Sequence, residues 1–187
     1  MANKVQFGIK NCHYAVITKS TTGTFSYATP VALPGAVNIS LDPSGEVTPF
    51  YADNMVYYNA VSNNGYTGTL ELAKIPDGFL KDIFGRTLTT GKVLMEDATV
   101  EPKEAALLFQ IEGDQTDERY LFYEVTFNRP GSSSATITDT KEPNTQSIEF
   151  SAIPSTDTTR PGIVSARTTD ETTSTVKSGW YTSVYAG

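Results

Sequence analysis

Short apolar runs alternate with polar stretches along the whole chain. The apolar runs are rich in β-branched and aromatic residues, and Ser, Thr, Gly, Asn and Pro separate them at intervals of roughly 8 to 12 residues. Several runs alternate apolar and polar residues with a period near two, which is typical of strands that bury one face. The pattern therefore predicts a mainly β fold.

The first part of the pattern predicts two hairpins. The expected strands are His13–Thr18, Gly23–Tyr27, Ala36–Leu41, Val47–Tyr51, Met55–Val61 and Tyr66–Ala73. Asp42–Gly45 has the composition of a tight turn, so we expect the strands on either side of it to pair. Asn63–Gly65 carries a similar signal and predicts pairing between the last two of these strands.

One segment breaks the β rhythm. The apolar residues of Ile75–Gly85 have the spacing of a helix face. We expect one short amphipathic helix from Asp77 to Phe84, with Asp77 as its N-terminal cap and Gly85 ending it in a left-handed conformation. Its apolar stripe is expected to lie on the sheet.

The strands expected after this helix are Lys92–Glu96, Ala105–Glu112, Tyr120–Phe127, Ala135–Thr138 and Ser147–Ile153. Ala105–Ile111 is almost continuously apolar, which predicts a central strand covered on both faces. Gly113–Asp117 is the expected tip between this strand and the next one. The last two strands are expected to form a final hairpin.

The composition changes after Ile153. Residues 1–153 are expected to form one β-sandwich domain, whereas Thr, Ser and Asp dominate residues 154–187 until Trp180. A disordered tail is one reading of this segment. The other, adopted for the domain division, is a C-terminal arm whose aromatic residues pack on neighbouring subunits.

Charge and cysteine content narrow the function classes. Lys and Arg number 14 against 21 Asp and Glu, a net charge of −7, which disfavours tight binding to a phosphate backbone. Cys12 is the single cysteine, so no intrachain disulfide and no zinc site built on paired cysteines is expected. The sequence shows neither a signal peptide nor an apolar run of membrane-spanning length, which predicts synthesis in a cytoplasm and no membrane partner.

The sequence offers few candidates for chemistry. His13 directly follows Cys12, and adjacent strand residues point to opposite faces, so a catalytic pair is not expected. Gly85–Lys92 resembles a phosphate-binding loop, but its glycine spacing is wrong and it precedes a strand, so we interpret it as a turn.

Acidic residues gather at two places, Glu96-Asp97 and Asp114 with Asp117-Glu118. Neither group matches a known ligand spacing, and both are interpreted as solvated loop residues, with a cation site at the second group as the weaker reading. We therefore predict no enzyme, no catalytic, cofactor-binding or metal-binding residues, and no cofactor.

A set of stretches points to a family. In chain order they are Phe50–Asn54, Gly68–Phe79, Ala106–Asp114, and Tyr120–Tyr123 followed by Arg129-Pro130. Together they resemble the major tail proteins of long, non-contractile-tailed bacteriophages, the phi13-type family, over most of the chain from about Ala36 to Pro154.

The resemblance implies a tail-tube subunit. Its fold would be a tail-tube-type β-sandwich or half-barrel flanked by one short helix, with an extended loop and terminal arms. Such subunits assemble into rings, expected to be hexameric, which stack into a hollow tube around a tape-measure protein. The tube would contact tail initiator (distal tail) and tail terminator proteins, and genome DNA would pass through it without specific binding. The expected location is the virion tail, after synthesis in the host bacterial cytoplasm.

The assembly would depend on exposed β edges and on polar extensions. Exposed edges can join subunit sheets into one closed barrel. We expect Asp42–Asn54 and the two terminal arms to contact neighbouring rings. Three alternatives remain: a ligand- or carbohydrate-binding β-sandwich that presents Tyr and Trp side chains, a capsid decoration or tail-terminator protein, and a hydrolase that uses Glu112 or Glu124.

Overall fold

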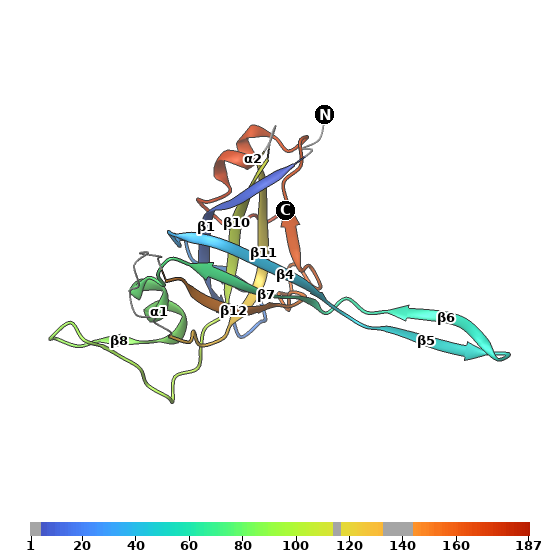
Figure 1. Ribbon diagram of the computed structural model, residues 1–187, viewed down its shortest axis with the longest axis horizontal. Coiled ribbons are helices and arrows are strands. Elements are labelled where there is room, and N and C mark those ends of the chain that lie inside the picture. Colours follow the sequence, from blue (N-terminus) through green and yellow to red (C-terminus); the bar gives the residue numbers. More distant parts are fainter. Residues whose placement is uncertain (1–4, 114–116, 133–143) are drawn as a thin grey trace, which may run out of the picture.

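The computed structural model describes residues 5–113, 117–132 and 144–187 (Figure 1). Within these residues the fold is mainly β, as the sequence predicts, with one large antiparallel sheet, two small two-stranded sheets and two helices. The expected strand Ala135–Thr138 lies outside the described residues, so the predicted final hairpin stays a prediction.

The main sheet has nine strands in the order β2-β1-β10-β11-β12-β7-β4, with β3 beside β1 and β13 beside β11. They are β1 (Gln6–Lys19), β2 (Phe25–Tyr27), β3 (Val31–Ala32), β4 (Ala36–Ser44), β7 (Gly65–Leu72), β10 (Ala105–Gly113), β11 (Glu118–Phe127), β12 (Gln146–Ala152) and β13 (Ser165–Arg167). β4 also lies against β1, so the sheet curls until strands from its two ends approach each other. This is the curvature expected of a half-barrel or sandwich.

Two short ribbons leave this body. The first pairs β5 (Val47–Ala52) with β6 (Met55–Val61), and the second pairs β8 (Thr87–Leu88) with β9 (Leu94–Met95). Figure 1 shows them projecting from opposite ends of the longest axis, β5–β6 to the right and β8–β9 to the left.

The pairing predicted for both early hairpins is wrong. β4 pairs with β7, and β5 pairs with β6. Neither expected turn reverses the chain. Asp42 and Pro43 lie inside the β4–β7 ladder, and Ser44 lies opposite Gly65 where this ladder passes into the β5–β6 ribbon. The chain reverses at Asp53 and Asn54, whose φ angles of 53° and 60° suit a two-residue type I′ turn.

Helix α1 (Asp77–Phe84) has the bounds that the sequence predicts. Gly85 ends it with a left-handed φ of 62°, also as predicted. Pro76 occupies the N-cap position without a side-chain hydrogen bond, and Asp77 is the first helical residue, so the prediction that Asp77 caps the helix is wrong. Phe79 is fully buried and meets Tyr14 of β1 edge-on, with ring centroids 5.0 Å apart. The Tyr14 hydroxyl donates a hydrogen bond of 2.7 Å to Asp82, which fastens the helix to the sheet.

Strand β10 lies at the centre of the core, as its apolar sequence predicts. Its residues from Ala105 to Gln110 are all buried. Leu107 and Phe109 belong to a large cluster shared with α1, whereas Ala106 and Leu108 belong to a second cluster on the other face of the sheet. Both faces of this strand are therefore covered.

The C-terminal segment supplies that second cover. It contains β13, which pairs with β11, and a second helix, α2 (Ser174–Gly179), which the sequence does not predict. Trp180 is buried, and it packs with Leu108 and Leu121. Residues 154–187 therefore pack on the chain's own sheet and not as a free arm or a disordered tail, and contact with a neighbouring subunit stays a prediction.

Candidate functional site

The sequence's one cysteine–histidine neighbour pair is not arranged for catalysis. Cys12 is buried, and this burial raises the pKa of its thiol to about 12. His13 stacks on Tyr181 with ring centroids 4.6 Å apart, and its Nδ1 lies 2.9 Å from the Asn11 carbonyl oxygen. The thiol is thus held in its neutral form, and the imidazole helps to hold the C-terminal segment.

The acidic residues near Glu96 are occupied by local contacts. Glu96 lies 2.5 Å from Arg86 and 3.5 Å from Arg129. Asp97 accepts hydrogen bonds from the backbone and hydroxyl of Thr99, which lower its pKa. These contacts secure the loop that follows the β8–β9 ribbon.

The other acidic group shows the same pattern. Asp114 lies outside the described residues. Asp117 and Glu112 both pair with Lys10, at 3.3 and 2.9 Å, and Glu118 pairs with Arg167 at 3.3 Å. In the part of the chain that the structure describes, no three potential metal ligands among His, Cys, Asp and Glu come together.

Glu124 is buried but structurally engaged. Its carboxylate accepts hydrogen bonds from the Thr156 amide at 2.7 Å and from Lys19 at 2.9 Å. Lys19 also lies 2.6 Å from Glu104. Burial lowers the pKa of Lys19, but its two carboxylate partners outweigh this and raise it overall. The network ties the start of the C-terminal segment to β1 and β11.

The stretch Gly85–Lys92 is predicted from the sequence to be a turn between helix and strand. It contains the short strand β8, which the prediction missed, and then the turn that leads to β9. Lys92 has a left-handed φ of 62°, and its amide donates to the Thr89 carbonyl oxygen at 2.9 Å. These contacts form the tip of the β8–β9 ribbon.

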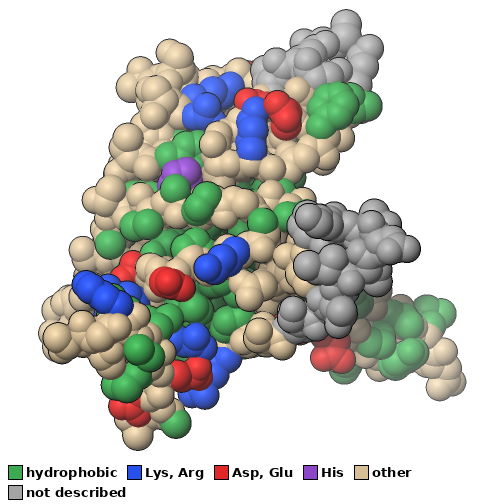
Figure 2. Space-filling model, turned by 60° about the vertical axis from the view of Figure 1, so that its left-hand side comes forward, with side chains coloured by type: hydrophobic (Ala, Val, Ile, Leu, Met, Phe, Trp, Pro, Cys, Tyr) green, Lys and Arg blue, Asp and Glu red, His purple; other side chains and the backbone are tan. Residues whose placement is uncertain are grey.

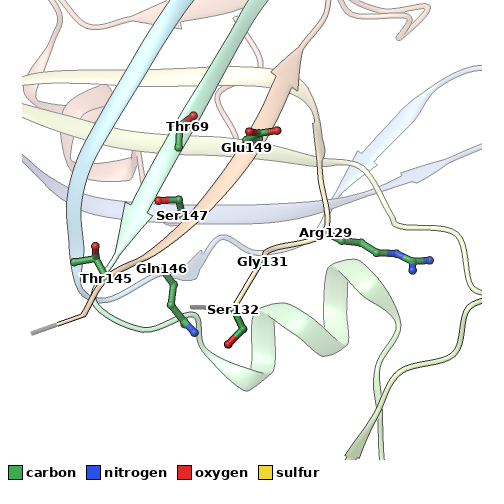
Figure 3. Close-up of a pocket in the computed structure, with 8 residues that line it drawn as sticks. All are labelled: Thr69, Arg129, Gly131, Ser132, Thr145, Gln146, Ser147 and Glu149. Atoms are coloured by element: carbon green, nitrogen blue, oxygen red, sulfur yellow. The ribbon is translucent and has the colours of Figure 1, made fainter. Parts of the chain in front are cut away.

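One polar hollow of about 410 Å³ lies over β7 and β12 (Figure 3). Thr69, Ser147 and Glu149 line it from the sheet, while Arg129 points away from these side chains, toward its partner Glu96. The described residues that line it include no aromatic side chain on which a sugar ring could stack. It lacks the apolar lining typical of a small-molecule site.

The β5–β6 ribbon is the most unusual surface of the described chain. Its large hydrophobic side chains are Val47, Phe50, Tyr51, Met55, Val56, Tyr57, Tyr58 and Val61, with exposed fractions from 47% for Val56 to 74% for Val61. Figure 2 shows hydrophobic side chains gathered on this projection, behind the body at the lower right. Exposed apolar surface on this scale is typical of surfaces that bind a partner.

The base of this ribbon is held by close backbone packing and by backbone hydrogen bonds. A Cβ atom on Gly45 would lie 2.2 Å from the Ser62 carbonyl oxygen, so only glycine allows the two strands to approach there. The Ser62 amide donates to Glu46 at 2.9 Å, and the Asn64 amide donates to Ser44 at 2.8 Å. The backbone ladder therefore continues from the sheet into the ribbon.

The sequence prediction missed this surface as a hairpin. It placed Asp42–Asn54 in contacts between rings, but it assigned the apolar residues of β5 and β6 to two different strand pairs. The available signal was the Asp53-Asn54 pair between two apolar runs, since both residue types tolerate the positive φ of a type I′ turn.

Neither helix of the described chain has the length and apolarity needed to cross a bilayer. A scan against protein-family models finds no match to this sequence, and a search of curated proteins finds no relative. The projecting hairpin, defined by its geometry and exposure alone, is therefore the candidate functional site.

Proposed function

We propose that this protein is a structural subunit that binds copies of itself, and that the assembly is the tube of a bacteriophage tail. The observation that carries the proposal is the β5–β6 hairpin with its eight exposed large hydrophobic side chains. An isolated two-stranded ribbon is marginally stable in water, so a partner that covers it would also stabilise it.

The sheet supports the same proposal. β4 ends the strand order, and within the described residues only β7 pairs with it along a ladder, while β1 lies close to it without strand pairing. An unpaired strand edge is a template for a strand from another chain. In the proposed ring, expected to have six members, edges of neighbouring sheets would join into one barrel, too wide for side chains to fill.

The chemistry of the surface agrees with a passive conduit. The net charge of −7 disfavours adhesion of DNA, which a channel for genome passage must avoid. The carboxylates that were candidates for catalysis hold loops or the C-terminal segment. In the proposed virion the tube surrounds a tape-measure protein and joins initiator and terminator proteins at its ends.

Negative-stain electron microscopy of the purified protein at rising concentration, with light scattering alongside, tests the proposal. Hollow tubes or six-membered rings are the expected result. A monomer at every concentration that binds a glycan array would contradict it and favour the carbohydrate-binding alternative. Single rings that never stack would favour a terminator.

A further inference from the structure

We propose that the β5–β6 hairpin of one copy docks on the β8–β9 ribbon of the next copy and joins the copies head to tail. This inference rests on the proposed self-assembly, and it names the surface that receives the hairpin. The hairpin surface is thus covered by a second copy of this chain, and the part of that copy that covers it is the β8–β9 ribbon.

The position of the two ribbons is the first reason. They project from opposite ends of the molecule's longest axis (Figure 1). Each ribbon is a two-stranded sheet of its own, and none of its strands appears in the strand order of the main sheet. A contact between two different surfaces at opposite ends is heterologous. Each copy then keeps one free surface, to which the next copy can bind by the same contact.

Apolar exposure is the second reason. The β8–β9 ribbon is small, yet Leu88, Val93 and Met95 have exposed fractions of 44%, 61% and 52%. Its remaining apolar residue, Leu94, is partly buried against the main core. The ribbon therefore presents an apolar face to solvent while its base is fixed to the body.

The ion pairs around Glu96 hold this receiving surface in place. Arg86, at the start of the ribbon, and Arg129, just after β11, both pair with Glu96. Gly85 joins the ribbon to α1 and packs against Val100, where a Cβ atom would lie 2.4 Å from the valine methyl. A firmly based ribbon loses less conformational entropy on binding than a free loop would.

Charge is the third reason. Residues 45–62 contain Glu46 and Asp53 and no Lys or Arg. In the β8–β9 ribbon Arg86 is paired with Glu96, so Lys92 at the tip carries its unpaired positive charge. Asp53 and Lys92 are exposed at the two ribbon tips, both with left-handed φ, and neither forms a salt bridge within the described residues. Pairing of two hairpins would bring like charges together, so complementarity favours the β8–β9 ribbon as partner.

Disulfide trapping tests the contact directly. Two full-length variants, Tyr57→Cys and Tyr58→Cys, place a thiol on either face of β6, since adjacent strand residues point in opposite directions. Each is mixed with Val93→Cys at the concentrations used for microscopy, under mild oxidation, and mass spectrometry identifies the linked peptides. Native Cys12 is buried and does not compete.

We expect one hairpin variant to form a mixed dimer with Val93→Cys several-fold more abundantly than with Thr175→Cys, a matched variant at an exposed position of α2. Dominant links between two hairpins would overturn the inference. So would the absence of any excess over the Thr175→Cys control.

Charge reversal provides a second readout. Asp53→Lys alone and Lys92→Glu alone should each weaken self-association by about two- to fivefold, the range for one exposed ion pair. The double variant should restore it, and failure of this rescue counts against the docking.

The two proposals can fail separately. Hollow tubes without the mixed disulfide would keep the tube and reject this docking partner. A mixed disulfide in chains that never form tubes would keep the docking and reject the tube.

Discussion

Strands β10 and β6 have similar apolar character and opposite surroundings. β10 reads AALLFQIEG, and its first six residues are buried. β6 reads MVYYNAV, and every residue of it is exposed. β10 has a neighbouring strand on each side and packed side chains on both faces, whereas β6 has β5 alone.

The difference shows that apolar strand sequences have two different positions in this chain, one inside the core and one exposed to solvent. In β10 apolar residues stabilise the folded monomer, because its own sheet and helices cover them. In β6 they are exposed and contribute little to the monomer. In the proposed assembly a neighbouring copy covers them, and the assembly surface is this apolar strand pair held away from the core.

The largest expected effect is a difference between the two strands in how much a truncated side chain lowers the free energy of unfolding. Phe109→Ala in β10 should lower the free energy of unfolding by about 3 to 5 kcal/mol, since it leaves a cavity where the ring stacked on Tyr120, 5.1 Å away. Tyr58→Ala in β6, the matched control, should change it by less than about 0.5 kcal/mol. Urea unfolding of both variants, at concentrations below assembly, checks this. Equal losses would show that the hairpin belongs to the core.

An effect of intermediate size tests whether residues 154–187 contribute to the stability of the folded body. Asp157 is buried, and its carboxylate accepts hydrogen bonds from the Thr159 amide at 3.0 Å and the Phe25 amide at 3.3 Å. Asp157→Asn should cost about 1 to 3 kcal/mol near pH 7, because it replaces the charged acceptor of these hydrogen bonds with a neutral amide. Such a loss would place residues 154–187 in the body with β10, and no loss would place them with the hairpin.

The pH dependence of the wild type gives the same residue a second test. Burial acts to raise the pKa of Asp157, but hydrogen bonds from Thr159 and Phe25 and the nearby Arg160 outweigh it and lower the pKa overall. A carboxyl with a lowered folded pKa stabilises above its unfolded pKa of about 3.9, and this stability is lost as pH falls toward the folded value. As the pH is lowered below about 4, the melting temperature should therefore fall more steeply for the wild type than for Asp157→Asn. Parallel profiles would exclude this role.

The smallest expected effect concerns the base of the β8–β9 ribbon. Gly85→Ala should cost about 1 to 2 kcal/mol, because alanine is strained at a left-handed φ and its Cβ would meet Val100. Gly78→Ala, inside α1 and without any atom within 4 Å of the added Cβ, should be neutral or slightly stabilising. Melting temperatures of the two variants check the pair. Indifference to Gly85→Ala would mean that the ribbon base is loose.

Local signals predicted the elements that local physics determines. The apolar spacing of Phe79 and Ile83 requires a helix face, and Gly85 supplies the left-handed residue that ends it. Ala105–Ile111 is apolar at every position but one, so its place between two packed faces could be predicted.

Strand pairing could not be predicted in the same way. Asp42–Gly45 and Asn63–Gly65 contain turn residues because the ribbon leaves the sheet there, and a change of direction needs the same residue types as a reversal. Helix α2 was missed because Thr and Ser dominate its sequence and its anchor, Trp180, follows it. The exposure of β6 could not be predicted, because it depends on which other elements pack against the strand, and the local sequence pattern does not contain that information.

Amide hydrogen exchange, compared between dilute protein and assembled protein, tests the central claim most directly. β10 should exchange slowly in both states. The amides of β5 and β6 should exchange rapidly in dilute protein and become at least tenfold slower on assembly, as a neighbouring copy covers the hairpin. If the hairpin exchanges equally fast in both states, its apolar surface is not the assembly surface, and the proposed self-association through β5 and β6 is wrong.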